Sequence, residues 1–291
     1  MESVAHRFVA RNPPHVRGEG EVNIVHTDDG ARALGFRGAL VPGCFAASHA
    51  INVAMRDRVD MLKDLRIHIF CKRPVYDGVA YCVTVDKGSV QIYPETGGDP
   101  CIVARVLQST APPPRDAWPP ERPRPPPASR LPATVDACPA GTVLGWIDFV
   151  VDPEARGHCG YTEVWRDGDR FTYAERCERL YGKCDGVALG GVVHPCYFLE
   201  VANGAVCSTI AVGPWIHVET EYEAFGAPVR LGERVSVRGV VRKAWTTRAG
   251  HHFVACDLFV VRLRGGGGEE DLAARMRHTA IIRVGRQTSR L

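Results

Sequence analysis

The chain has 291 residues, of which 45% are hydrophobic and 24% are charged, the composition of an ordinary globular protein with room for two domains. A formal net charge of +3 is too small to indicate a nucleic-acid or membrane-surface partner, and no apolar run is long enough to span a membrane. The N-terminal residues lead into no signal-type apolar segment, and the 11 cysteines are scattered without a Cys-x-x-Cys pair. We therefore expect a cytoplasmic protein with reduced, mostly buried thiols.

The chain carries the same pattern twice. Residues 38–45 (Gly-Ala-Leu-Val-Pro-Gly-Cys-Phe) return 152 positions later as residues 190–197 (Gly-Gly-Val-Val-His-Pro-Cys-Tyr). Two shorter matches follow in the same order, 67–69 with 216–218 and 74–78 with 228–232, at offsets of 149 and 154. Three landmarks at a nearly constant offset predict a tandem duplication, and two copies are too few for a solenoid. We expect a pseudo-dimer within one chain.

Each copy predicts an apolar helix, residues 44–55 and 196–207, followed by strands whose apolar residues alternate with period two. Residues 265–268, all glycine, indicate a hairpin tip. Residues 111–133 hold ten of the 21 prolines and predict an extended connector that joins no sheet. The expected domains are therefore 1–110 and 134–291. The predicted strands are 66–70, 79–85, 89–93 and 102–108 in the first half, and 216–222, 234–243, 252–262 and 278–284 in the second.

A helix that is apolar on most of its circumference, followed by several antiparallel strands, must be wrapped by the sheet. This order of an apolar helix followed by antiparallel strands resembles the hotdog fold. Residues 35–43 (Gly-Phe-Arg-Gly-Ala-Leu-Val-Pro-Gly) resemble the turn into the helix of MaoC-like hydratases and dehydratases, and residues 74–78 extend the likeness. The resemblance implies an α+β double hotdog: two tandem hotdog domains, each a curved antiparallel sheet wrapped around a long apolar helix.

The start of each predicted helix offers a site for a thioester carbonyl oxygen, because free N–H groups form the positive end of a helix. In the first copy we expect Gly43 and Cys44 to bind substrate. In the second, Pro195 supplies no N–H, so Cys196 and Tyr197 are the expected donors. The alternative is that the glycines only serve a tight turn.

Glu200 is the leading candidate for acid–base chemistry. It lies in an otherwise apolar helix, where a charged carboxylate is costly to bury, so it suits a group that gains and loses a proton. The hotdog dehydratases of fatty-acid synthesis and some hotdog thioesterases carry an acid at this helical position, and the resemblance implies the same role here. The first copy has Ser48 instead, which predicts a single active site. Asn203, one turn further, is expected to orient a water or a carbonyl. The alternatives are a Glu200 that faces solvent or pairs with an arginine, and an Asn203 that caps or packs against the backbone.

Two histidines are candidates for the partner of Glu200. The His that precedes the turn in hotdog dehydratases is absent from residues 33–36, whereas His194 directly precedes the second turn. His26 ends a segment that resembles the Asp-x-Asn-Pro-x-His motif of (R)-specific enoyl-CoA hydratases, with Glu21 for Asp and Ile24 for Pro. The alternative is that residues 21–26 form an ordinary strand.

Arg37 is a candidate for a carrier's phosphate or pantetheine arm, with an exposed structural arginine as the alternative. Taken together, the resemblance implies a MaoC-like lyase that adds or eliminates water through an enolate of an acyl thioester of coenzyme A or a carrier protein. It implies neither a metal nor a redox cofactor. The incomplete histidine pattern favours a diverged tailoring enzyme of secondary metabolism that catalyses elimination, isomerisation or cyclisation. A hotdog thioesterase and a non-catalytic acyl-binding or scaffold protein are the alternatives, and association of two chains into a homodimer stays open.

Overall fold

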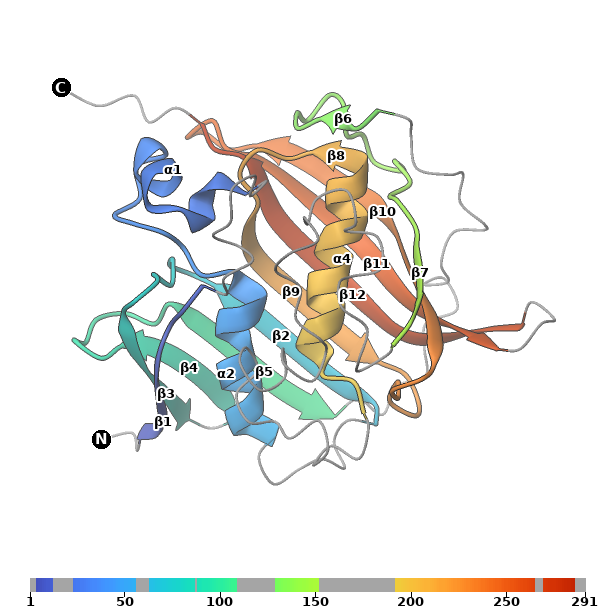
Figure 1. The fold of residues 1–291 in the computed structure, drawn as a ribbon, viewed down its shortest axis with the longest axis horizontal. Coiled ribbons are helices and arrows are strands. Elements are labelled where there is room, and N and C mark those ends of the chain that lie inside the picture. The colour runs from blue at the N-terminus through green and yellow to red at the C-terminus, as the bar shows by residue number, and fades with distance from the viewer. Residues whose placement is uncertain are drawn as a thin grey trace.

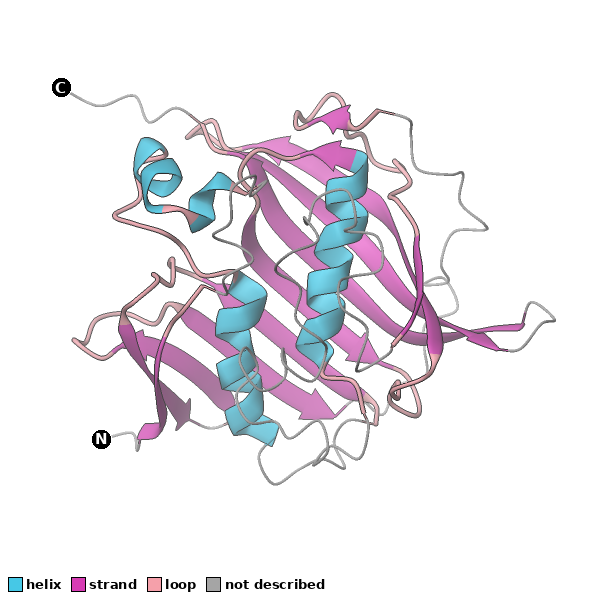
Figure 2. Ribbon diagram, viewed as in Figure 1, coloured by secondary structure: helices cyan, strands magenta, loops and turns pink. Residues whose placement is uncertain are grey.

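Ten antiparallel strands form one continuous sheet, and two long helices lie across the same face of it (Figures 1 and 2). The structure is a computed structural model that describes residues 4–12, 23–55, 63–86, 88–108, 129–151, 192–264 and 269–285. In spatial order the strands are β1 (Val4–Val9), β3 (Ala80–Asp86), β4 (Ser89–Pro94), β5 (Ile102–Gln108), β2 (Leu65–Cys71), β9 (Ile216–Ala224), β12 (Glu269–Arg283), β11 (His252–Arg264), β10 (Arg234–Thr246) and β7 (Ile147–Val150).

The sheet is joined at its middle by strands from the two halves of the chain. Strand β2 pairs with β9 antiparallel, from Arg66 opposite Glu223 to Phe70 opposite Glu219. Five strands on one side of this junction come from the first half, and five on the other side come from the second. This arrangement confirms the predicted internal pseudo-dimer and the double-hotdog architecture.

The two helices, α2 (Gly43–Met55) and α4 (Pro195–Thr209), confirm the predicted helices 44–55 and 196–207. They contact each other, and the residues they bury are largely small or branched apolar side chains. Burial of each large apolar side chain stabilises the fold by about 1.5–3 kcal/mol. Fully buried positions include Ala47, Ala50 and Ile51 on α2, Val201, Ala202 and Ala205 on α4, and Ile67, Ile69, Ile92, Val235, Val254 and Leu258 on the sheet beneath them.

One expectation about local structure was wrong. Strand β12 begins at Glu269 instead of residue 278, because its pairing with β11 continues to the end of that strand, where Arg264 lies opposite Glu269. The described end of segment 21–26 is a turn of 3-10 helix, η2 (Ile24–His26), so the alternative of an ordinary strand does not hold there. The short helix α1 (Asp28–Ala33) follows it, and Thr27 caps α1 by accepting a hydrogen bond from the Gly30 amide.

The Pro-rich connector is partly outside the described residues, which resume at residue 129. Its end does join a sheet, contrary to expectation: β6 (Leu131–Pro132) pairs in parallel with β8 (Ile210–Ala211). Proline lacks an N–H but keeps its carbonyl, so it is tolerated in such a short edge pairing. The glycine run 265–268 also lies outside the described residues, between the paired ends of β11 and β12.

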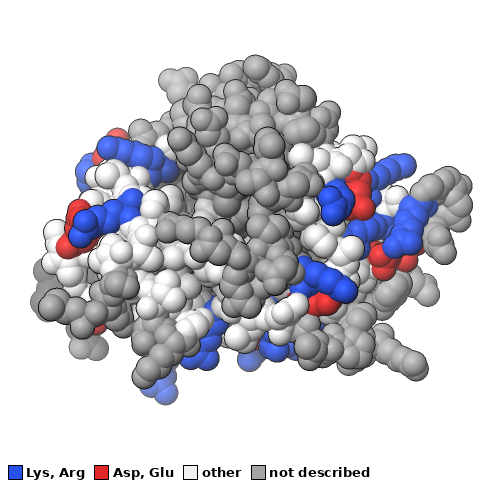
Figure 3. All heavy atoms as spheres, turned by 90° about the horizontal axis from the view of Figure 1, so that it is seen from below, with Lys and Arg blue, Asp and Glu red and all other residues white. Residues whose placement is uncertain are grey.

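The surface and the thiols agree with the composition. In the face shown in Figure 3, basic and acidic side chains of the described residues lie next to one another. The eight cysteines of the described residues are free, and most are buried. No helix in this part of the chain has the length and apolar character needed to cross a membrane.

Candidate active site

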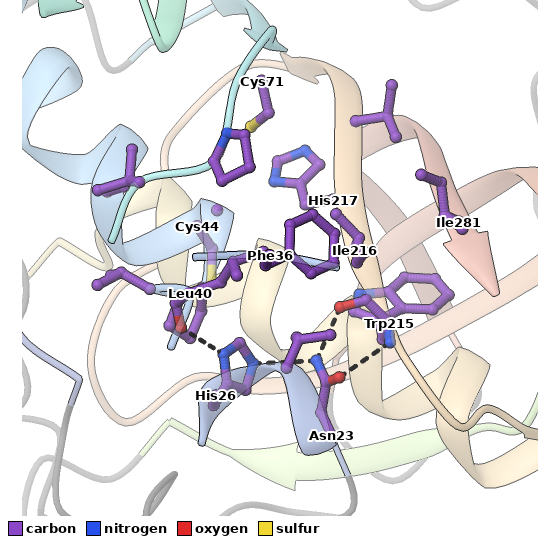
Figure 4. A pocket seen from close by; sticks show the side chains of 18 of the residues that line it. Asn23, His26, Phe36, Leu40, Cys44, Cys71, Trp215, Ile216, His217 and Ile281 are labelled. Atoms are coloured by element: carbon purple, nitrogen blue, oxygen red, sulfur yellow. Dashed lines mark hydrogen bonds between the residues drawn. The ribbon is translucent and has the colours of Figure 1, made fainter. Parts of the chain in front are cut away.

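A cavity of about 440 Å³ lies at the start of α2, where the two halves of the chain meet (Figure 4). Side chains from both halves line it, and most of them are apolar. The polar lining residues include His26, Glu200, Asn203 and His217. The apolar wall includes Val25, Phe36, Leu40, Val75, Trp215, Ile216, Phe253 and Ile281.

The first turn of α2 opens into this cavity. The Pro42 carbonyl accepts hydrogen bonds from the amides of Phe45 (3.0 Å) and Ala46 (3.1 Å), and a proline side chain has no atom that caps a helix. Gly43 and Cys44, which precede these residues on the helix, both line the cavity. Among the described residues no oxygen acceptor is hydrogen-bonded to the amides of Gly43 and Cys44. The positive end of α2 therefore faces the cavity.

Helix α4 of the other half brings a carboxyl group to this helix start. Glu200 lines the cavity and is only 4% exposed. The pKa of the Cys44 thiol is raised, first by burial and then by the nearby Glu200 charge, so Glu200 lies close to the start of α2. Asn203, one turn further along α4, also lines the cavity, and its buried Oδ1 has no hydrogen-bond partner within the described residues. The structure thus brings together four of the candidate residues, namely Gly43, Cys44, Glu200 and Asn203.

His26 reaches the same cavity from the first half. Its Nδ1 lies 2.7 Å from the Leu40 carbonyl oxygen, which only accepts hydrogen bonds, so Nδ1 carries the proton. Nε2 then accepts from the Asn23 side-chain amide at 3.0 Å. Burial lowers the pKa of His26 to about 4, partly opposed by the hydrogen bond to Leu40, so the ring is neutral near pH 7.

Asn23, the matching Asn of the hydratase-like motif, joins the two halves. Its side chain donates to the Trp215 carbonyl (2.7 Å) and accepts from the Trp215 amide (3.0 Å). Trp215 is a wall of the cavity, as Figure 4 shows. Asn23 therefore holds both the ring of His26 and the backbone of Trp215 in place. Glu21, the acidic residue of the motif, lies outside the described residues.

His217 is a cavity residue that the functional reading of the sequence missed. It lies on β9 and packs against the first residue of α2: a Cβ atom on Gly43 would fall 2.6 Å from His217 Nδ1 and 2.8 Å from its Cβ. The glycine at position 43 is therefore required by this imidazole. Burial lowers the pKa of His217 to about 4, partly opposed by a hydrogen bond of the imidazole to the backbone of Glu219. The repeat places a histidine in both 67–69 and 216–218, which could have drawn attention to His217. The two histidines differ in structure, since His68 is half-exposed and its Nε2 lies 2.7 Å from Glu219 Oε1.

His194 and the start of α4 lie away from this cavity. The His194 side chain caps α4: Nδ1 accepts from the Cys196 amide at 3.1 Å, so Nε2 carries the proton and donates to Asn52 Oδ1 at 2.9 Å. The Tyr197 amide donates to the His194 carbonyl oxygen. Burial lowers the pKa of His194 to about 3. The His194 ring and the amides of Cys196 and Tyr197 are thus already hydrogen-bonded within the protein. Catalysis by His194 and substrate binding by Cys196 and Tyr197 stay predictions.

The edge of the cavity carries basic side chains other than the predicted one. Lys72 and Arg73 are exposed and line the cavity. Arg37 is exposed but is not among the lining residues, and its guanidinium lies over the Tyr76 ring at 4.0 Å. Binding of a phosphate by Arg37 stays a prediction.

One group of described side chains has metal-ligand atoms close enough to hold an ion, namely His68, Glu219 and Glu221, within 4.8 Å of one another. They lie on β2 and β9 and do not line the cavity. A hydrogen bond accounts for their arrangement, since His68 Nε2 lies 2.7 Å from Glu219 Oε1, with Glu221 at 3.9 Å.

Comparison with known proteins identifies the fold. No protein-family model and no curated protein match the sequence. A conserved hypothetical protein from Mycobacterium tuberculosis, described as essential for bacterial survival during infection and as a double hotdog, shares 13% identity over 96% of both chains with a TM-score of 0.59. A provisionally assigned MaoC domain protein dehydratase from Chloroflexus aurantiacus shares 12% identity over 96% of this chain and 95% of that one, with a TM-score of 0.53. The chain thus has the double-hotdog fold, as predicted.

Proposed function

We propose that this double-hotdog protein is a hydratase or dehydratase of acyl thioesters, with one active site at the start of α2. The observation that carries the proposal is the uncapped first turn of α2, which faces a buried glutamate of the other hotdog inside an apolar cavity. A carbonyl oxygen needs such amides when it gains negative charge, and proton transfer needs such an acid.

The chemistry follows from the placement of these groups. The amides of Gly43 and Cys44 hold the thioester carbonyl oxygen and stabilise the enolate that forms when the α-proton leaves. One such donor contributes about 10²–10³ in rate. Glu200 protonates the departing β-hydroxyl in dehydration, or takes a proton from water in hydration. His26, neutral and held by Asn23, is the second proton-transfer candidate, and Asn203 Oδ1 is an acceptor for the hydroxyl or water.

The lining of the cavity supports an acyl thioester as the substrate class. Phe36, Trp215, Ile216 and Ile281 form an apolar wall for the acyl chain. Exposed Lys72 at the edge, next to Arg73, whose guanidinium pairs with Asp99, suits the phosphates of coenzyme A or of a carrier's pantetheine arm. Three thiols line the cavity, and burial raises the pKa of Cys44 and of Cys71, so these two are protonated and poor nucleophiles near pH 7. A tailoring role in secondary metabolism and a cytoplasmic location remain predictions.

A thioesterase is the second candidate. It is favoured by one observation: both ring nitrogens of His26 are already hydrogen-bonded. Hydrolysis by a water that Glu200 activates needs the open helix end but no histidine. A non-catalytic acyl-binding protein is the third, and it requires no acid at position 200.

The test uses the purified full chain and a panel of 3-hydroxyacyl-CoA and 2-enoyl-CoA thioesters of increasing chain length, free and transferred to a carrier protein. Ultraviolet absorbance of the conjugated double bond reports addition or loss of water, and a thiol reagent reports hydrolysis. We expect absorbance changes without thiol release, and a Glu200→Gln variant that binds but does not turn over. Thiol release at the wild-type rate of turnover identifies a thioesterase. Absence of both signals across the panel contradicts the proposal.

A further inference from the structure

His217 is linked through one hydroxyl group to a second buried histidine. Its Nε2 lies 2.7 Å from Thr220 Oγ1, and the same oxygen lies 2.7 Å from His278 Nδ1. Thr220 is fully buried, and His278, on β12 opposite Thr220, is 2% exposed. The three side chains form a chain of hydrogen bonds that leads from the cavity into the core of the second hotdog.

The chain of hydrogen bonds ties the two imidazole tautomers together. A hydroxyl donates one hydrogen bond and can accept two. The described residues give Thr220 Oγ1 no partner besides the two rings, so it donates to one ring nitrogen and accepts from the other. If Nε2 of His217 carries the proton, Thr220 donates to His278 Nδ1, and His278 keeps its proton on Nε2. That Nε2 is buried and has no hydrogen-bond partner among the described residues. The ring of Trp215 stacks on His278 at a centroid distance of 5.4 Å and holds it in place.

The start of α2 favours this tautomer of His217. Nδ1 lies close to Gly43, since a Cβ atom there would fall 2.6 Å from it, and the helix presents its positive end at this residue. A lone pair is attracted to a positive helix end while a proton is repelled. The start of α4 shows the same preference, since Nδ1 of His194 accepts a hydrogen bond from the Cys196 amide in its first turn. His217 and Glu200 therefore flank the same helix start, one against Gly43 and the other beside Cys44.

We propose that His217 is a catalytic residue of this site, whose Nδ1 takes the α-proton, and that Thr220 and His278 are positioning residues that fix its tautomer. The inference rests on the proposed function and adds the base that acts opposite Glu200. In dehydration the Nδ1 lone pair binds the α-proton, and the C–H electrons form the double bond. The bond from the β-carbon to oxygen breaks, and the carboxyl proton of Glu200 goes to that oxygen, so that water leaves. Transfer of the proton from His217 to the Glu200 carboxylate restores both groups.

The first experiment separates the two proton transfers. The probes are the 3-hydroxyacyl-CoA that the wild type dehydrates fastest and its saturated analogue in deuterium oxide, where exchange of the α-proton is read by mass. We expect His217→Asn to slow both dehydration and α-exchange by about 100-fold or more. Glu200→Gln should stop dehydration but keep α-exchange within about threefold, because only the second proton transfer uses the acid. His68→Asn, the matching histidine outside the cavity, is the control and should leave both rates unchanged.

The second experiment tests the hydrogen-bond chain. Thr220→Val should lower kcat about tenfold with KM unchanged, and Thr220→Ser, which keeps the hydroxyl, should restore it. Nitrogen-15 NMR of the wild type should show His217 protonated at Nε2 and Thr220→Val should show a mixture of tautomers.

Each failure has a distinct meaning. Wild-type α-exchange in His217→Asn, together with inactive Glu200→Gln, overturns this inference and leaves the proposed function standing. Full activity of Glu200→Gln overturns both. Nitrogen-15 shifts that place the proton of His217 on Nδ1 overturn the inference without any variant, so the test does not depend on whether His217→Asn folds.

Discussion

The two central helices start in the same way in sequence and in opposite ways in structure. Helix α4 follows His194, whose imidazole accepts the hydrogen bond of the Cys196 amide and is itself held by Asn52 on α2. Helix α2 follows Pro42, which has no capping side chain, and its first amides face a cavity. Two aligned positions differ at the helix starts: His194 replaces Pro42 as the residue before the helix, and Pro195 replaces Gly43 as its first residue. The histidine caps one helix end, and the proline in its place leaves the other end open.

The two copies also differ in the helical acid, which is present on the helix with the capped start and absent from the helix with the open start. Glu200 on α4 faces the open start of α2, whereas its counterpart Ser48 on α2 donates to the Phe45 carbonyl of its own helix at 2.6 Å. Open amides and a carboxyl group therefore meet in one of the two related positions. A duplicated fold can keep one site and use the other for stability.

Exchanging the acid tests this asymmetry most strongly. Glu200→Gln keeps the shape of the side chain and removes its proton, and we expect kcat to fall by about 10²–10⁴. Ser48→Ala, at the related position, should change kcat by less than about twofold. Steady-state kinetics with circular dichroism as a check of the fold measures both. An equal loss in the two variants would mean that the two positions do not differ in function.

Closing the open helix start should have the next largest effect. In Gly43→Ala the new methyl group meets the side chain of His217 at 2.6–3.0 Å, so either the imidazole or the helix must move. We expect a loss of about 100-fold in kcat and about 1–3 kcal/mol of stability.

The matched control is Gly213→Ala, because a Cβ there meets no atom within 4 Å. Thermal unfolding and kinetics on both variants check the prediction. A Gly43→Ala protein with normal turnover would show that close packing at the start of α2 is not needed for activity.

The capped helix should respond in stability and not in turnover. The pKa of His194 is lowered by burial to about 3, below its value near 6.5 in an unfolded chain. The unfolded state binds the proton first, so the neutral ring contributes its full stability above about pH 6.5 and loses it as the pH falls toward 3. Asparagine also caps helices but does not titrate in this range. In His194→Asn the free energy of unfolding should therefore fall by about 2 kcal/mol less than in the wild type between pH 6.5 and 5.

Urea unfolding over this pH range measures the difference between His194→Asn and the wild type. Because His26 and His217 also have pKa values lowered to about 4, the variant should keep a shallower dependence on pH and not lose it entirely. If His194→Asn folds normally but loses turnover, the catalytic role that the sequence predicts for His194 gains support.

The sequence predicted the elements because apolar periodicity and duplication are local signals. The repeat indicated both helix starts, and the resemblance indicated Glu200, but neither said which start the acid would face. It missed His217 because the two short matches with histidine are not equivalent in the sheet. In β2 the buried residues Ile67 and Ile69 flank His68, whereas β9 is irregular beside His217, where its pairing with β12 shifts. A bulge of one residue turns a side chain to the other face, and no pattern along the chain reveals it.

The smallest effect is expected where the sequence placed a phosphate contact. Arg37 lies over Tyr76, outside the cavity lining, whereas Lys72 is exposed and lines the cavity. Arg37→Ala should therefore leave KM for a CoA thioester within about twofold, apart from a loss of about 0.5–1 kcal/mol in stability from the ring contact. Lys72→Ala should raise KM about threefold at low salt, and added salt should reduce the difference because it screens an exposed charge. Initial rates at two ionic strengths measure both variants. A larger rise in KM for Arg37→Ala than for Lys72→Ala would move the phosphate contact from the cavity edge to the turn before α2, where the sequence offered Arg37 as a candidate.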